Sequence, residues 1–249
     1  MIFKNIIEEI DAIIERDPAA RSRWDVVFSY PSFHAMRFHR LAHFFWKHNF
    51  RFLGRFVSQW GRFWTGIEIH PAAKIGGKFF ADHGMGVVIG ETAEIGDNVT
   101  LYHDVTLGGT APAVDSRAQV NVKRHPTLQD NVIVGSGAQI LGPITVRSGA
   151  RVGANAVVVQ DVPANATVVG IPARVVGGAS EVQAFIAYGT PCPEMPDPIQ
   201  HAVDDLIRTV HALQARVGEL ENEVHELRSD AEPAKVTIEA LKAANERGG

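Results

Sequence analysis

Three polar clusters interrupt the apolar middle of the chain and carry side chains suited to acid–base chemistry. They span residues 67–71, 81–86 and 107–126, and each contains a histidine: His70, His83 and His125. Histidine changes its charge near neutral pH, so each is a candidate general base. The second cluster also contains Asp82, directly before His83.

The spacing of Glu68 and His83 predicts that they work as a pair. They are 15 residues apart, and one coil of a β-helix built from three six-residue sides takes about 18 residues. His83 therefore falls about two sides and two residues after Glu68, at the same corner of the neighbouring coil. A carboxylate beside an imidazole fixes its tautomer and raises its basicity.

A six-residue repeat of aliphatic side chains predicts the scaffold that holds these clusters. It runs through Val134, Ile140, Val146, Val152 and Val158, and earlier members are Ile69 and Ile75. A further stretch with the same spacing, shifted by two residues, contains Ile89, Ile95, Leu101 and Leu107. Helices repeat near 3.6 residues and strands near 2, whereas six fits a parallel β-helix. Glycine often follows the inward residue, and we expect it there because corners need unusual backbone angles.

The repeat defines a β-helix domain at residues 67–178, preceded by an α-helical domain at 1–66. A polar loop at 108–126 leaves the coil, and such loops usually carry function. In the helical domain Pro31 breaks the pattern, and six Arg or Lys with no acidic residue lie between His34 and Arg62. That basic, aromatic segment suits either a membrane or RNA surface or packing against a partner subunit, which we favour.

The last part of the chain predicts a coiled-coil helix. After a proline-rich linker at 179–200, residues 201–231 carry Val and Leu at alternating spacings of three and four, namely Val203, Leu206, Val210, Leu213, Val217, Leu220, Val224 and Leu227. Arg216 would face Glu221, and Glu223 would face Arg228, of a parallel copy, so the charges favour parallel self-association. The alternative is an amphipathic helix folded back on the body. Residues 232–249 are expected to be a flexible tail.

Composition narrows the class of protein. The chain has 249 residues, 45% of them hydrophobic, and a net charge of −4, which argues against nucleic-acid binding. The single cysteine, Cys192, indicates a reducing compartment. No signal peptide or run of about 18 apolar residues is apparent, so we expect a cytoplasmic protein without a membrane span.

Five motifs together closely resemble the serine O-acetyltransferases, a family of hexapeptide-repeat acyltransferases. The resemblance extends from about residue 17 to 176. Hexapeptide repeats are common to many acyltransferases, but the pairing of Asp-His-Gly with Arg-His-Pro is specific. The motifs are Glu-Ile-His-Pro-Ala-Ala-Lys-Ile-Gly (68–76), Asp-His-Gly-Met-Gly-Val-Val-Ile-Gly-Glu-Thr-Ala (82–93), Val-Thr-Leu-Gly-Gly-Thr (105–110), Arg-His-Pro (124–126) and Gly-Ile-Pro-Ala-Arg-Val-Val (170–176).

The resemblance implies a left-handed parallel β-helix that assembles as a homotrimer or a dimer of trimers, with active sites between subunits. It implies transfer of acetyl from acetyl-CoA to the hydroxyl of L-serine, the first step of cysteine synthesis from serine, without a metal. His83 matches the general base and Glu68 its carboxylate partner, where long members carry Asp. The serine contacts match Asp17, Asp82, Arg124 and His125, and the acetyl-CoA contacts match Gly108, Gly109, Thr110, Ser136 and Ala154.

Two features depart from the family pattern. The loop between Thr110 and His125 is longer than usual. The family's C-terminal residue is often an Ile that inserts into the active site of cysteine synthase, whereas this chain ends Asn-Glu-Arg-Gly-Gly. The sequence therefore argues against cysteine synthase as a partner, and it leaves the coiled coil to serve assembly.

Three other functions compete with serine acetylation. An acetyltransferase for another amino-acid or sugar hydroxyl would use the same fold, although Arg124 with Asp82 favours an amino-acid acceptor. A zinc hydrolyase needs three converging histidines, and His83, His103 and His125 lack such spacing. A non-catalytic trimeric scaffold would not need the Asp82-His83 and Arg124-His125 motifs.

Overall fold

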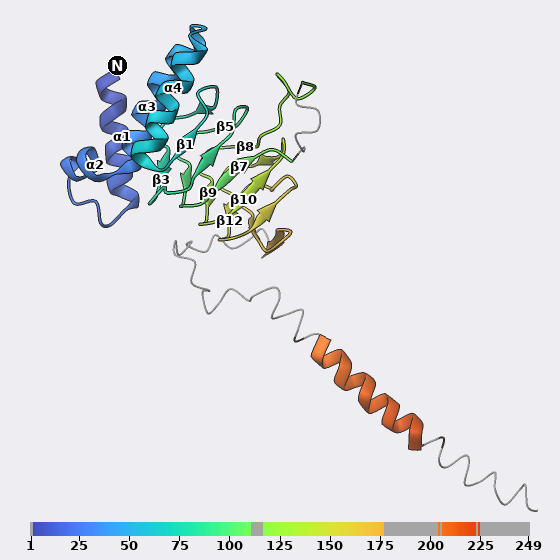
Figure 1. Cartoon of the computed structure of the whole chain (residues 1–249). Helices are drawn as coiled ribbons and strands as arrows, with labels where there is room; N and C mark the ends of the chain where they lie inside the picture. Colours follow the sequence, from blue (N-terminus) through green and yellow to red (C-terminus); the bar gives the residue numbers. More distant parts are fainter. Residues whose placement is uncertain (1, 111–116, 177–203, 205, 223, 225–249) are drawn as a thin grey trace, which may run out of the picture. The chain divides into compact units, whose positions relative to one another are not determined.

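The chain forms four N-terminal helices, a parallel β-helix and a C-terminal helix in a computed structural model (Figure 1). The structure describes residues 2–110, 117–176, 204, 206–222 and 224. It divides into two compact units, Met1–Thr190 and Pro191–Gly249. The predicted linker at 179–200, the tail at 232–249 and Cys192 lie outside the described residues.

The helical region contains α1 (Ile2–Arg16), α2 (Arg23–Ser29), α3 (Pro31–Lys47) and α4 (Arg51–Thr65). Pro31 occupies the first turn of α3, where its missing N–H costs no hydrogen bond. Gly66 ends α4 in the left-handed conformation, with φ of 70°, which glycine adopts without steric cost. The predicted break at Pro31 is therefore the boundary between two helices.

The β-helix consists of three sheets whose short strands alternate along the chain. The first sheet contains β1 (Glu68–Ile69), β4 (Val88–Ile89), β7 (Thr106–Gly108), β10 (Gln139–Leu141) and β13 (Val157–Val158). The second contains β2 (Lys74–Ile75), β5 (Glu94–Ile95), β8 (Thr127–Leu128) and β11 (Thr145–Val146). The third contains β3 (Phe80–Ala81), β6 (Thr100–Leu101), β9 (Ile133–Val134), β12 (Arg151–Val152), β14 (Thr167–Val169) and β15 (Arg174–Val176).

The register of the first sheet explains the six-residue repeat. Ile69, Ile89, Leu107, Ile140 and Val158 stand in one column of paired residues. All are at most 4% exposed. The column passes directly from Leu107 to Ile140, so the loop after β7 leaves the coil without shifting its register. The predicted parallel β-helix is confirmed, and burial of these side chains stabilises it.

The glycines after the inward residues have a different role from the one predicted. Gly76 and Gly135 do not have positive φ; the left-handed turns contain other residues, such as Asn98 and Asn155. A Cβ on Gly135 would instead lie 2.6 Å from the backbone N of Ala154 in the next coil. These glycines are needed because successive coils approach closely there.

The helices satisfy the open edge of the first coil. Ser58 of α4 donates to the carbonyl of Ile69 at 2.6 Å, and the guanidinium of Arg40 donates to the carbonyl of Ile75 at 2.8 Å. Ser32 accepts from the backbone N–H of Ala81 at 2.8 Å. Unpaired strand edges promote aggregation, so the helical region acts as a cap on each of the three sheets.

The outer face of α4 carries exposed aromatic side chains. Those that are at least 45% exposed are Phe52, Phe56, Trp60, Phe63 and Trp64. The opposite face packs through Gly54, Ser58, Gly61 and Thr65, all buried. The described residues leave this aromatic face exposed, so both the predicted subunit contact and the membrane or RNA surface stay predictions. Among the described residues, no helix has the length and apolarity to cross a membrane.

Candidate active site

One corner of the β-helix carries a column of predicted site residues. Ala81, Leu101, Val134 and Val152 are paired in register across β3, β6, β9 and β12. Each of these residues is followed, two positions later in the sequence, by a residue at the corner of the coil: His83, His103, Ser136 and Ala154. We call this corner, where the chain passes from the third sheet to the first, the His83 corner. It places the candidate base in line with two predicted acetyl-CoA contacts.

His83 begins this column and is exposed in the single chain. It has φ of 58°, a conformation uncommon outside glycine and often found at functional sites. Its ring centroid lies 6.0 Å from that of His103, with the planes at 75°. The Nδ1 atom of His103 is buried without a hydrogen-bond partner in the described structure. The two imidazoles therefore adjoin in successive coils.

Two carboxylates from different parts of the chain lie near each other beside the His83 corner. Asp82 is buried, and this burial raises its pKa; nearby Asp17 raises it further, while His83 opposes the shift. Asp17 follows α1 and accepts a hydrogen bond of 2.6 Å from the hydroxyl of Tyr30. Burial and then this bond raise the pKa of Tyr30, so Tyr30 stays a donor. The structure thus brings Asp17 close to Asp82, which directly precedes His83.

Glu68 lies close to the same corner but has another partner. Its backbone N–H donates to the carbonyl of Val87 at 2.8 Å. Its carboxylate lies 3.2 Å from a guanidinium nitrogen of Arg62. In the described part of the chain, Glu68 and His83 form no hydrogen bond or ion pair, although their segments adjoin.

Arg124 and His125 lie at a different corner, where the chain passes from the first sheet to the second. We call it the Arg124 corner. The Arg124 guanidinium donates to Glu91 at 2.6 Å. The hydroxyl of Thr92 lies 2.9 Å from Nδ1 of His125 and accepts from the backbone N–H of Arg124 at 3.0 Å. The same short segment, Glu91 and Thr92, thus holds both predicted serine-carboxylate ligands.

Burial controls the electrostatics of the Arg124 corner. Burial and then the Arg124 charge lower the pKa of His125. Burial raises the pKa of Glu91, but the hydrogen bond from Arg124 and the nearby His70, Arg124 and His125 together lower this pKa overall. Burial likewise lowers the pKa of His70 to about 4. At neutral pH the corner therefore presents neutral imidazoles and a guanidinium that is paired with an ionised Glu91.

The remaining predicted acetyl-CoA contacts lie at the end of β7. Gly108 accepts from the N–H of Gly142 at 2.9 Å. A Cβ on Gly109 would lie 3.3 Å from the carbonyl of Arg124. Thr110 packs close to Gly142. This segment begins the loop that ends at Arg124, so its backbone N–H groups lie along the Arg124 corner.

The two corners do not converge within one chain. The first sheet forms one side of the coil, and the two corners lie at its two ends. A side of six residues spans up to about 20 Å, at 3.3 Å per residue. His83 and Arg124 of one chain therefore stand at different corners of the coil.

The comparisons with known proteins agree on one family. No protein-family model matches the chain. A serine acetyltransferase of Bacillus pumilus is 48% identical over 221 residues, which cover 88% of this chain and 97% of the relative. The chain belongs to the serine acetyltransferase family. This confirms the resemblance drawn from the motifs.

Solved serine acetyltransferase structures have the same fold. One in complex with CoA is 37% identical, with a TM-score of 0.64, and the match covers 70% of this chain and 69% of that one. One from Neisseria gonorrhoeae in complex with serine is 38% identical, with a TM-score of 0.65, and the match covers 71% of this chain and 69% of that one. Among the described residues of this serine acetyltransferase, no group of three His, Cys, Asp or Glu is placed to hold a metal.

Sequence reasoning missed residues that position the predicted ligands. Tyr30 contacts Asp17, and Glu91 and Thr92 contact the Arg124 corner. The sequence analysis did not place His103 beside His83, although the repeat contains the information: His103 follows the inward Leu101 by two residues, as His83 follows Ala81. Tyr30 has no such periodic signal, because its contact depends on how α1 and α3 pack.

Proposed function

We propose that the protein is a serine O-acetyltransferase that transfers acetyl from acetyl-CoA to the hydroxyl of L-serine. Family membership, at 48% identity over 221 residues, carries the proposal. The closeness of Asp17 to Asp82, which directly precedes His83, supports it, because two carboxylates near a base suit an acceptor with both a hydroxyl and an ammonium group. The single cysteine fits a reducing compartment, so we place the reaction in the cytoplasm.

His83 is the proposed general base. It takes the proton of the serine hydroxyl as that oxygen attacks the thioester carbon. The carbon–sulfur bond then breaks, and the imidazolium returns the proton to the CoA thiolate. Glu68, released from Arg62, would hold the imidazole in the correct tautomer and stabilise its charged form. Backbone N–H groups near Gly108–Thr110 are the candidate donors to the thioester oxygen as it gains negative charge.

Serine would be held at both ends. Asp17 and Asp82 suit its ammonium group, while Arg124 and His125 suit its carboxylate. Since these pairs lie at different corners of one chain, we place the active site between adjacent copies of a homotrimer. In such an assembly the Arg124 corner of one chain faces the His83 corner of its neighbour.

Acetyl-CoA would lie along the His83 corner. In the coils that follow those of His83 and His103, the column continues with Ser136 and Ala154. Their small side chains leave room for acetyl-CoA, which is long and thin. Gly108, Gly109 and Thr110 would contact it from the neighbouring chain. Transfer is direct in a ternary complex, since no Cys or Ser nucleophile needs to be acylated.

The decisive experiment measures CoA thiol release by purified protein from acetyl-CoA with L-serine, homoserine or simple sugars. We expect release that depends on serine and that His83→Ala removes. Release with another acceptor only would keep the chemistry and reject serine as the substrate. No release with any acceptor would reject the enzyme and favour the scaffold. A trapped acetyl-enzyme would overturn direct transfer.

A further inference from the structure

The C-terminal helix presents an apolar stripe that its own unit leaves exposed. Residues 206–222 are helical. The described members of the stripe are between 43% and 64% exposed, namely Leu206, Val210, Leu213, Val217, Leu220 and Val224. Their spacing alternates between three and four residues, so all lie along one seam of the helix. A seam of this kind without a partner is unfavourable in water.

We propose that this seam pairs, parallel and in register, with the same helix of a second copy of the chain. The inference goes beyond the acetyltransferase activity and does not depend on it. Val at every a position and Leu at every d position is the combination that favours two strands in parallel coiled coils.

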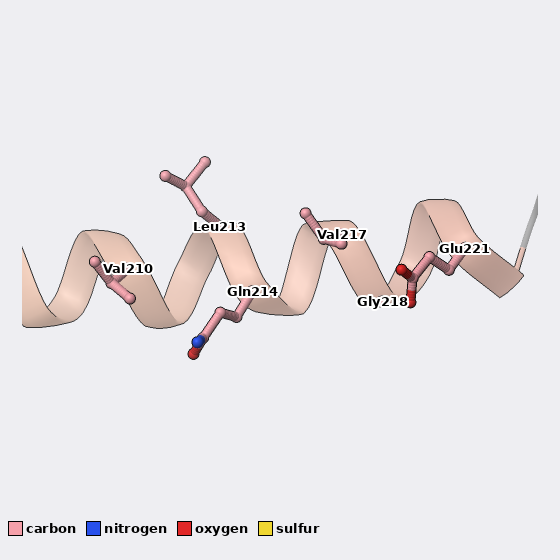
Figure 2. A pocket seen from close by; sticks show the side chains of 6 residues that line it. All are labelled: Val210, Leu213, Gln214, Val217, Gly218 and Glu221. Carbon is pink, nitrogen blue, oxygen red and sulfur yellow. The ribbon is translucent and has the colours of Figure 1, made fainter.

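A hollow on the helix surface matches the proposed pairing. Figure 2 shows its six lining residues, which are Val210, Leu213, Gln214, Val217, Gly218 and Glu221. Four of them surround one point on the helix surface, at positions i, i+3, i+4 and i+7, namely Val210, Leu213, Gln214 and Val217. In a coiled coil each apolar side chain of the seam inserts into such a four-residue hole on the facing helix. In the proposed pair, Leu213 of the second copy would insert among these four residues.

The charges beside the seam select a parallel arrangement. Arg216 occupies a g position and Glu221 the following e position, and these positions face each other between parallel copies. Within the helix Arg216 lies 2.8 Å from Glu219, and in the proposed pair it turns from Glu219 to Glu221 of the second copy. The second predicted pair, Glu223 with Arg228, lies outside the described residues.

Site-specific crosslinking of the full chain tests the proposal. Cys192→Ser removes the one native thiol, and Leu213→Cys or Val210→Cys then places a single thiol in the seam. A short bismaleimide should convert either seam variant to covalent dimer. Ala215→Cys, on the far side of the same helix, is the matched control and should stay monomeric on denaturing gels. Equal crosslinking at all three positions, or none in the seam, would overturn the proposal.

A charge exchange tests the direction of the helices. In the Leu213→Cys background, Arg216→Glu should slow crosslinking because it places two glutamates face to face. Adding Glu221→Arg should restore the rate. Failure of the double variant to recover would show that these two residues do not meet, and would reject the parallel register. Serine-dependent CoA release by each variant checks separately that the catalytic part is intact.

Discussion

At the residue scale, Glu68 has two possible partners, and they predict different phenotypes. Its carboxylate pairs with Arg62 in the chain, while the proposed mechanism needs it beside His83. If it orients the base, Glu68→Gln should lower kcat by at least about tenfold, since loss of the comparable carboxylate in hydrolase triads costs far more. Arg62→Gln is the matched control, because it breaks the ion pair and keeps the carboxylate.

Steady-state kinetics and thermal unfolding of the two variants separate the roles. A catalytic Glu68 gives a large loss of kcat in Glu68→Gln alone, with similar melting temperatures for both variants. Similar, small losses of kcat in both would show that Glu68 serves only the ion pair. An exposed pair contributes at most about 1 kcal/mol, so the stability of either variant should change little.

Tyr30 should act on serine binding through Asp17. Its hydroxyl donates to Asp17 at 2.6 Å, and its ring lies 6.5 Å from that of Phe80. Tyr30→Phe keeps the ring and removes only the hydrogen bond, whose charged acceptor makes it worth about 1.5–3 kcal/mol. We expect KM for serine to rise roughly tenfold or more, with KM for acetyl-CoA unchanged. A loss of kcat alone would contradict this positioning role.

At the element scale, the hexapeptide spacing was enough to predict the fold. Each inward residue, such as Leu107 or Val134, recurs with the repeat and is fully buried. The cap on the first coil was not predictable, because Ser32, Ser58 and Arg40 reach strands at least 11 residues away. Such contacts depend on tertiary packing and leave no local pattern. For the same reason the contact of Tyr30 with Asp17 could not be predicted from the sequence.

The glycine of each coil gives a sharp test of close packing between coils. Gly135→Ala places a Cβ 2.6 Å from a backbone nitrogen, which cannot move aside as a flexible side chain can. We expect a loss of about 1–3 kcal/mol in the free energy of unfolding, as for other overpacked cores. Gly77→Ala, whose Cβ would meet only Asp97 at 3.6 Å, should stay within about 0.5 kcal/mol. Urea unfolding measures both.

At the scale of the whole molecule, buried histidines should make the fold sensitive to acid. Burial lowers the pKa of His39 to about 3, with Arg40 and His43 adding to the effect. The unfolded chain takes up this proton near pH 6.5, so its stabilisation is complete above that pH and falls away towards pH 3. At pH 5 the loss is about 2 kcal/mol for His39 alone. Urea unfolding from pH 7.5 to 5 should show it, and His39→Gln should reduce the slope; an unchanged slope would contradict it.

The separation of the two corners predicts complementation between inactive chains. His83→Ala removes the base and Arg124→Ala removes the carboxylate ligand, so each variant alone should be inactive. If one site combines His83 of one chain with Arg124 of its neighbour, a trimer that mixes both variants contains intact sites. Random mixing at equal amounts makes about one site in four intact, so about a quarter of wild-type activity should return after the two are unfolded and refolded together.

A site within one chain predicts the opposite result, because every chain in the mixture then carries a damaged site and no activity returns. The double variant His83→Ala/Arg124→Ala, mixed with either single variant, is the control: each site then lacks at least one of the two residues, so activity should stay absent. Recovery in the first mixture and none in the control would place the reaction between subunits. The β-helix offers a physical reason for the proposed arrangement: its sides hold the two corners apart, so in the proposed site a neighbouring copy brings Arg124 to the serine molecule that faces His83.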